Sequence, residues 1–364
     1  MIIQNVMIRK SFCNARLCLA LFFIFAACSP QAVYMGAQGK EVMGTYCRID
    51  LFENGNSGLY EKLFTRLEEL EKIFSASRDD SELAEINRNA GLKPVEVSRE
   101  LYTVLERSLY FSEATYGAFD PTIGPLVRLW GIGTEWAKIP SDGEINAALA
   151  LVNFRNLELT AGSKHPGKAQ LTAGTAFLKK KGMSLDLGAI AKGYAADELI
   201  SILQKENISR ALIDLGGNIY IWGKKDSGEL WHVGVQEPLG VRGNIAGILE
   251  LEGSISVVSS GIYERFFTGD DGKHYHHILE LKENENSIHQ EGRRGYPAEN
   301  GVLSTTIIAP SSMDADALST SCFLLGYEKG LALAAAHGAE VLYIMEKSGI
   351  RGSPGAMAIF KLPE

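Results

Sequence analysis

The sequence predicts an α+β fold in a single large domain, and three observations support this prediction. Candidate strands and amphipathic helices follow one another along the 364-residue chain without a regular strand–helix–strand repeat, which argues against a doubly wound sheet. Hydrophobic residues make up 46% of the chain and charged residues 22%, a composition typical of a globular protein with a sizeable core. No Pro- or Ser-rich linker follows residue 41 and no fixed-period repeat is present, so one domain is expected.

The N-terminal residues have the pattern of an export signal. Three basic residues precede the apolar run 17–28, which is too short for a comfortable membrane span and ends in small residues before Cys28. We expect a cleaved signal peptide over residues 1–27, with a signal-anchor helix as the alternative. Because the ending Phe-Ala-Ala-Cys resembles the lipobox of bacterial lipoproteins, Cys28 would carry lipid, residues 28–40 would form a tether, and 41–364 the folded domain. This pattern predicts an inner-membrane lipoprotein that faces the periplasm.

Net charge limits the classes of binding partner. The formal net charge of −8 becomes more negative when the basic leader is removed, whereas a protein that binds phosphate backbones should carry a basic face. Nucleic acid is therefore not expected as a partner.

Outside the leader and Cys28, the two cysteines Cys47 and Cys322 lie in apolar stretches and are interpreted as buried thiols, with one disulfide as the alternative in an exported protein.

Hydrophobic periodicity predicts the elements in chain order. A half-buried strand is expected over residues 41–52, followed by helices over 59–74 and 101–111 that should pack on a sheet. Further strands are expected at 156–160, 211–215, 218–222, 232–235, 256–259 and 305–309, and further helices at 189–203 and 315–335. No G-x-G-x-x-G follows a strand and no G-x-x-x-x-G-K-[ST] is present, so neither a Rossmann nor a P-loop nucleotide site is predicted.

Two carboxylates stand at the start of the helix expected after residue 312, in the stretch Met-Asp-Ala-Asp-Ala-Leu-Ser-Thr at 313–320. Carboxylates there usually cap the free N–H groups, which explains one of the two. On a helix, Asp316 and Thr320 lie one turn apart on one face, so their oxygen atoms could share a Mg²⁺ or Ca²⁺ ion. Capping and metal binding both remain open on this stretch alone.

Three glycine-containing stretches suggest ligand contacts. Gly and Pro residues force an irregular loop at 116–124 around Phe119 and Asp120, which could hold a flat heterocycle or be a packed turn. A strand carrying Asp186 is expected to pass through a glycine into a helix carrying Lys192, which suits an anion but also a plain glycine cap. The glycine pair at 216–217 permits positive φ or close approach of a ligand.

Three histidines occur within four residues, at His274, His276 and His277. They suggest zinc, but no cysteine is near and only the first two would share the face of a strand. A single catalytic histidine is the preferred interpretation, because imidazole titrates near neutral pH.

Six motifs in this order, across roughly residues 41–345, resemble the ApbE family of FAD:protein FMN transferases. They are Met-Gly-Thr at 43–45, Gly-Ala-Phe-Asp-Pro-Thr-Ile-Gly at 117–124, Leu-Asp-Leu-Gly-Ala-Ile-Ala-Lys-Gly-Tyr at 185–194, Gly-Gly-Asn at 216–218, His-Ile-Leu at 277–279 and Asp-Ala-Asp-Ala-Leu-Ser-Thr at 314–320. The resemblance implies mixed or antiparallel sheets with packed helices. It also implies an exported Mg²⁺-dependent enzyme that transfers the FMN half of FAD to a Thr or Ser of a target protein, such as an exported or membrane redox protein, and releases AMP.

The resemblance also implies roles for single residues. Mg²⁺ would be held by the Ala189 carbonyl and the side chains of Asp316 and Thr320, with Asp314 left as the better capping candidate. His277 would lie nearest to proton transfer and, with Asp316, carry the catalysis. The FAD site would be lined by Met43, Ala118, Phe119, Asp120, Asp186, Lys192, His277 and Ile278.

Two departures from the family pattern leave the reaction open. Ser77 stands where many of these transferases carry an aromatic residue against the nucleotide, and the polar run 282–295 is interpreted as a surface insertion near the site. An FAD pyrophosphatase that yields FMN and AMP, and a flavin-binding lipoprotein without catalysis, therefore remain alternatives.

Overall fold

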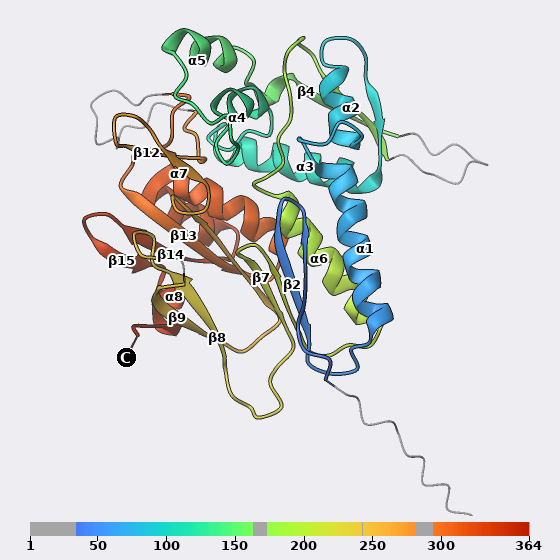
Figure 1. The fold of residues 1–364 in the computed structure, drawn as a ribbon, viewed down its shortest axis with the longest axis vertical. Coiled ribbons are helices and arrows are strands. Elements are labelled where there is room, and N and C mark those ends of the chain that lie inside the picture. The colour runs from blue at the N-terminus through green and yellow to red at the C-terminus, as the bar shows by residue number, and fades with distance from the viewer. Residues whose placement is uncertain (1–33, 163–172, 242, 282–293, 364) are drawn as a thin grey trace, which may run out of the picture. The chain divides into compact units, whose positions relative to one another are not determined.

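The computed structural model describes residues 34–162, 173–241, 243–281 and 294–363, which are coloured in Figure 1. The lipidation candidate Cys28, the expected signal peptide and most of the polar run 282–295 lie outside the described residues. Among the helices that are described, none is both long and apolar enough to cross a membrane.

Strands and helices mix along the described chain, as the α+β prediction requires. The helices are α1 Ser57–Phe74, α2 Glu82–Arg88, α3 Arg99–Ala114, α4 Gly124–Trp130, α5 Asp142–Leu149, α6 Ala191–Lys205, α7 Ser312–Ala336 and α8 Pro354–Ile359, with a 3₁₀ turn at Phe154–Asn156. The strands are β1 Gln38–Val42, β2 Thr45–Leu51, β3 Val95–Val97, β4 Leu157–Ala161, β5 Gly174–Leu178, β6 Ala211–Leu215, β7 Asn218–Trp222, β8 Trp231–Gln236, β9 Ile245–Leu251, β10 Ile255–Gly261, β11 Phe266–Thr268, β12 His274–His276, β13 Val302–Ala309, β14 Glu340–Met345, β15 Gly349–Gly352 and β16 Phe360–Lys361.

The central sheet runs in the order β1-β2-β6-β7-β10-β13-β14-β15, and every neighbouring pair is antiparallel. Smaller antiparallel sheets are formed by β16-β9-β8, by β3-β5-β4 and by the β11-β12 hairpin. Antiparallel pairing without crossover helices confirms the α+β prediction and excludes a doubly wound fold.

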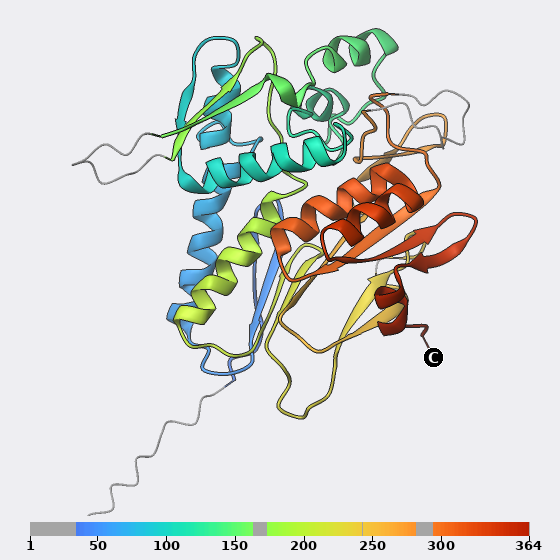
Figure 2. The ribbon, with the colours of Figure 1, turned by 180° about the vertical axis from the view of Figure 1, so that it is seen from behind.

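Both faces of the central sheet are covered, because adjacent side chains on one strand enter different cores. On β10, Val258 enters the core shared with the helices, whereas Val257 packs with β8, β9 and β16. Ile307 and Ile308 on β13 divide in the same way. Figure 2 shows α6 and α7 side by side in front of the strands. Burial on both faces explains why apolar residues stand next to one another in these strands, as at Val257-Val258 and Ile307-Ile308, instead of strictly alternating with polar ones.

Two local predictions are wrong. The single strand expected over 41–52 is a hairpin, in which Met43 and Gly44 form the turn between β1 and β2 with φ of 59° and 69°. The chain reverses there because Gly44 adopts the left-handed conformation without steric cost. Strand β1 also begins at Gln38, inside the expected tether. The strand expected to carry Asp186 is not formed. This segment makes an isolated parallel bridge between Ile123 and Ser184, and the Asp186 N–H donates to the Pro121 carbonyl at 2.8 Å.

Candidate functional site

The first turns of α6 and α7 touch at Gly193. A Cβ atom placed on Gly193 would lie 2.2 Å from the Ser312 carbonyl oxygen and 2.7 Å from the Cβ of Asp316. Any side chain would therefore push the two helices apart, and glycine is required for the close approach. The Gly193 N–H donates a 2.8 Å hydrogen bond to Asp316 Oδ2, so a carboxylate on α7 satisfies a free donor at the start of α6.

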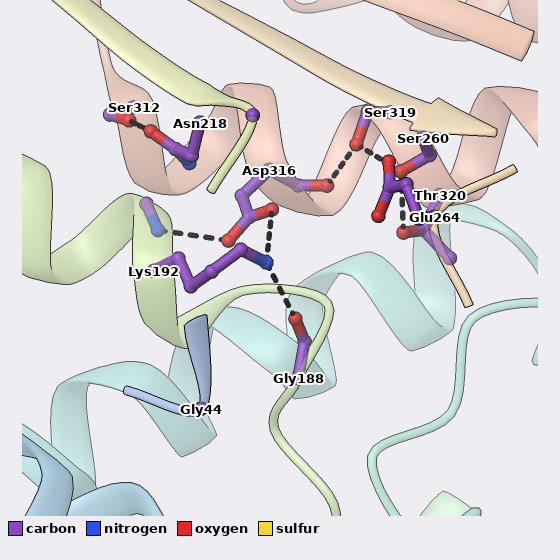
Figure 3. A network of polar contacts seen from close by, with 12 residues as sticks. Gly44, Gly188, Lys192, Asn218, Ser260, Glu264, Ser312, Asp316, Ser319 and Thr320 are labelled. Atoms are coloured by element: carbon purple, nitrogen blue, oxygen red, sulfur yellow. Dashed lines mark hydrogen bonds and ion pairs between the residues drawn. The ribbon is translucent and has the colours of Figure 1, made fainter. Parts of the chain in front are cut away.

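The second oxygen of Asp316 faces a cation. Asp316 is buried, and its Oδ1 lies 3.7 Å from the Nζ of Lys192, which also donates to the Gly188 carbonyl at 3.2 Å. Figure 3 shows these groups converging between the two helices. The predicted site residues Asp316 and Lys192, far apart in sequence, are thus brought together, and Asp316 Oδ1 has no hydrogen bond from the described residues.

The start of α7 is capped differently from the prediction, which assigned the cap to Asp314. The N-cap is Ser311, whose hydroxyl accepts the Asp314 N–H at 3.3 Å, and the two N–H groups after Ser311 donate to the Asp197 carboxylate. Asp314 instead makes two 2.7 Å hydrogen bonds with Arg107. The prediction fails because Asp197 comes from another helix, which the local sequence does not reveal.

Thr320 lies one helical turn beyond Asp316. Its hydroxyl is 3.3 Å from Ser260 Oγ, which is itself 2.7 Å from Ser319 Oγ, and Ser319 donates to the Asp316 carbonyl at 2.8 Å. These hydroxyl contacts extend from α7 to the end of β10, as Figure 3 shows. They hold Thr320 on the same side of α7 as the carboxylate.

The residues present fit a hard divalent cation. A continuing helix would give the Gly193 N–H to the Ala189 carbonyl, but this donor goes to Asp316, and no backbone hydrogen bond to the Ala189 carbonyl occurs among the described residues. A carbonyl, a buried carboxylate and the Thr320 hydroxyl are the oxygen ligands that Mg²⁺ and Ca²⁺ prefer. Within the described ranges, no three His, Cys, Asp or Glu side chains gather in a group that could hold a metal ion.

His277 follows directly after β12 and faces Glu264, a residue that the sequence interpretation missed. The His277 N–H donates to the Arg265 carbonyl at 3.1 Å, its Nδ1 lies 3.3 Å from the same oxygen, and its Nε2 lies 3.9 Å from Glu264 Oε2. Burial lowers the pKa of His277 to about 3 and raises the pKa of Glu264 to about 7. Each side chain still keeps about 30% of its surface accessible, so water reaches both groups.

Of the three neighbouring histidines, His277 is the one that lies beside Glu264. His274 is exposed and its ring lies 5.0 Å from that of Phe266. His276 is buried, with its Nε2 3.0 Å from the Ala298 carbonyl, and burial lowers its pKa to about 4. The three imidazoles therefore have separate surroundings.

The other predicted FAD-lining residues lie mainly in the supporting core. Ala118, Phe119 and Ile278 are buried in the helix-side core, and Met43 packs against it. These side chains therefore belong to one apolar core that spans these sequence-distant motifs.

The two further carboxylates in these motifs fix the backbone. Asp120 Oδ1 accepts the Thr122 N–H and its Oδ2 the Phe154 N–H, each at 2.8 Å, which ties the loop at 116–124 to the 3₁₀ turn, and burial raises the pKa of Asp120. Asp186 Oδ1 accepts the Gly188 N–H at 2.8 Å and shapes the turn that leads into α6. Both therefore have structural partners in addition to any ligand.

The remaining predictions concern glycines and thiols. Gly216 and Gly217 adopt φ of 67° and 91°, which confirms the positive φ expected at this turn. Cys47 and Cys322 are free and buried, which confirms the interpretation as thiols and excludes a disulfide between them.

The order of these motifs has a match among known families. The family model described as ApbE family matches residues 43–343, a span that contains every element of the site. The chain belongs to the ApbE family. Site residues from the β1-β2 turn, the start of α6, the β11-β12 hairpin and α7 all fall within the match.

Relatives and solved structures agree with the ApbE assignment. A FAD:protein FMN transferase of Treponema pallidum is 40% identical over 333 residues, covering 88% of this chain and 87% of its own. One from Klebsiella pneumoniae is 35% identical and covers 80% and 83% of the two chains. The crystal structure of the ApbE protein from Thermotoga maritima has a TM-score of 0.75 at 31% identity, covering 89% of this chain and 98% of that one. The flavin transferase ApbE from Vibrio cholerae has a TM-score of 0.71 at 29% identity, covering 87% and 96%.

Proposed function

We propose that this ApbE-family protein is an Mg²⁺-dependent FAD:protein FMN transferase, which attaches FMN through a phosphoester bond to a Thr or Ser of a target protein and releases AMP. The observation that carries the proposal is the junction of α6 and α7, where Asp316 lies beside Lys192. The names of the relatives, FAD:protein FMN transferase, support it.

The reaction requires a cation site and a fixed positive charge, and the junction of α6 and α7 offers residues for both. The hydroxyl oxygen of the acceptor bonds to the FMN phosphorus, while the bond from that phosphorus to the oxygen of AMP breaks and leaves its electron pair on AMP. Mg²⁺ bound by Ala189, Asp316 and Thr320 would neutralise negative charge on the pyrophosphate. Lys192, held by the Gly188 carbonyl, supplies a fixed positive charge next to the same position.

His277 is the candidate for the proton of the acceptor hydroxyl. Its Nδ1 is held at the Arg265 carbonyl, which leaves Nε2 as the basic atom, and its lowered pKa keeps the ring neutral at pH 7. The apolar core residues Ala118, Phe119, Met43 and Ile278 support the surface against which the flavin nucleotide would bind.

A specific observation favours a second candidate, an Mg²⁺-dependent FAD pyrophosphatase. Ser77 is exposed, and its hydroxyl lies 3.1 Å from the Ser75 hydroxyl, so it offers no ring to stack on the nucleotide. A less tightly enclosed phosphorus is more open to water. Both reactions use the same metal and the same substrate and differ in whether the acceptor is a protein hydroxyl or water.

One experiment separates the three alternatives. The protein is incubated with FAD, MgCl₂ and an exported redox protein that contains candidate Thr and Ser acceptors, and the products are analysed by mass spectrometry. An FMN adduct on the acceptor supports the transferase, and free FMN with AMP alone supports the pyrophosphatase. Intact FAD in every sample would leave a non-catalytic flavin-binding protein and contradict the proposal.

We further propose that lipid on Cys28 holds the catalytic domain at the inner membrane, facing the periplasm. The apolar run before Cys28 and its lipobox-like end support this location. Cys28→Ala should release the protein into the soluble fraction. If the variant still sediments with membranes after a salt wash, the anchor lies elsewhere.

A further inference from the structure

The dipeptide Glu264–Arg265 brackets the imidazole of His277. The Arg265 carbonyl approaches Nδ1, and the Glu264 carboxylate lies 3.9 Å from Nε2 on the opposite side of the ring. Because a carbonyl oxygen can only accept, the proton of the neutral ring is placed on Nδ1, and Nε2 carries the lone pair. The Arg265 guanidinium is turned away, towards the Gly44 carbonyl at 3.4 Å.

We propose that Glu264 is a positioning residue of this reaction, which acts through His277 by stabilising the imidazolium that forms when Nε2 accepts the proton of the acceptor hydroxyl. The inference rests on the proposed function, whose bond changes are those given above. The proton moves from the hydroxyl oxygen to Nε2, and no further reactant is needed.

The charge that faces Glu264 changes when the proton is transferred. Before it, a carboxylate faces a lone pair and gains nothing from the contact. After it, the same carboxylate faces an N–H bearing positive charge across 3.9 Å, a distance at which opposite charges attract one another more strongly in a partly buried pair than in bulk water. An interaction that appears only as the reaction proceeds lowers the barrier without tightening substrate binding.

The surroundings of Glu264 agree with this role. Among the described residues, His277 is the basic side chain found within 4.0 Å of the Glu264 carboxylate. Burial is the main reason that the pKa of Glu264 is raised to about 7, and Asp316 adds to the effect while Lys192 and Arg265 oppose it. Glu264 therefore interacts electrostatically with the proposed metal ligand Asp316 as well as with the base His277.

The test is a double-mutant cycle on AMP release from FAD under single-turnover conditions. Glu264→Gln should slow release by roughly 10- to 100-fold with the FAD dissociation constant changed less than about twofold. In a His277→Ala background, Glu264→Gln should have no further effect, because the group it acts through is gone. Equal losses in both backgrounds would overturn the proposal.

The chain offers a matched control. His232 on β8 and Glu250 on β9 form a pair of nearly the same geometry, with 3.8 Å between Nε2 and Oε1, away from the site. Glu250→Gln should leave AMP release unchanged. Glu264→Asp, which retains the charge on a shorter side chain, should recover part of the rate lost in Glu264→Gln.

A second readout uses the protein without metal or FAD, so that it remains decisive if the proposed function fails. The ring carbon shifts of His277, followed by NMR through pH 7, should show a step near pH 7 as Glu264 ionises. Glu264→Gln should remove the step and Glu250→Gln should keep it. An identical step in Glu264→Gln, or no step in the wild type, contradicts the coupling. Absence of AMP release from the wild type, with the NMR step present, contradicts the transferase proposal alone.

Discussion

Neighbouring residues of the same type, two aspartates and two histidines, differ between the packed region and the site. In the packed region, both carboxylate oxygens of Asp314 lie 2.7 Å from Arg107, and Nε2 of His276 lies 3.0 Å from the Ala298 carbonyl. In the site, Oδ1 of Asp316 lies 3.7 Å from Lys192, and Nε2 of His277 lies 3.9 Å from Glu264. The packed groups have partners at hydrogen-bond distance, whereas each site group has one atom that receives no hydrogen bond from the described residues.

The largest expected effect comes from Asp316→Ala. Turnover with Mg²⁺ should fall to background, because the variant lacks the proposed carboxylate ligand. Loss of the buried bond to Gly193 should also lower the free energy of unfolding by about 1–3 kcal/mol. Asp316→Asn, which keeps an acceptor for that N–H, should recover part of the stability and none of the activity. Full activity in Asp316→Ala would place the metal elsewhere.

The next effect is expected for His277→Ala, which should slow turnover by roughly 10²–10⁴-fold with little change in FAD affinity, the usual range for loss of a general base. The measurements are the single-turnover rate and the FAD dissociation constant on one sample. A weaker affinity with an unaltered rate would mean that His277 only contacts the flavin. His274→Ala serves as the control, since the exposed His274 ring packs beside Phe266 and not beside Glu264.

His276 should act on stability rather than on rate. Burial lowers its pKa to about 4, so between pH 6.5 and 4 the unfolded chain binds a proton that the folded chain does not. Its contribution to stability is complete above pH 6.5 and is lost as the pH falls through this window, by about 2–3 kcal/mol at pH 4.5. Denaturant unfolding of His276→Gln should therefore show a weaker decline between pH 7.5 and 4.5 than the wild type. Parallel declines would contradict the pKa.

The smallest effect is expected for Asp314→Ala. The half-buried ion pair with Arg107, whose guanidinium also lies over the Tyr110 ring at 4.2 Å, should contribute about 1 kcal/mol. Turnover should change less than about twofold, as judged by AMP release at saturating FAD. A large loss of activity here, with Asp316→Ala unaffected, would reverse the roles assigned to the two carboxylates.

Sequence patterns located the long elements well, because their burial is periodic. The helix expected at 59–74 has Leu63, Leu67, Leu70 and Phe74 buried, and the strands expected at 211–215 and 218–222 coincide with β6 and β7. Short strands such as β11 and β16 were missed, since two or three residues carry no periodic signal. The turn at Met43 and Gly44 was missed because alternation continues through it.

The site was predicted where its residues lie in family-like motifs, and it was incomplete where tertiary contacts decide. Asp316 and Lys192 were both expected, but their approach depends on the contact of two helices at Gly193. Glu264 lies outside the six motifs, and a single Glu after a strand gives no signal by itself. Asp197 caps α7 from another helix, so no window of sequence contains both partners.

The contact at Gly193 couples formation of the site to the packing of α6 on α7. The Ser312 carbonyl and the Asp316 Cβ lie directly on the Gly193 backbone, so the helix contact sets where the Asp316 backbone stands, and a slip of α7 by one turn would move it by about 5.4 Å. Any ion that binds to Asp316 binds only the fully packed chain, so its occupancy should be read directly as a rise in the melting temperature of the whole domain.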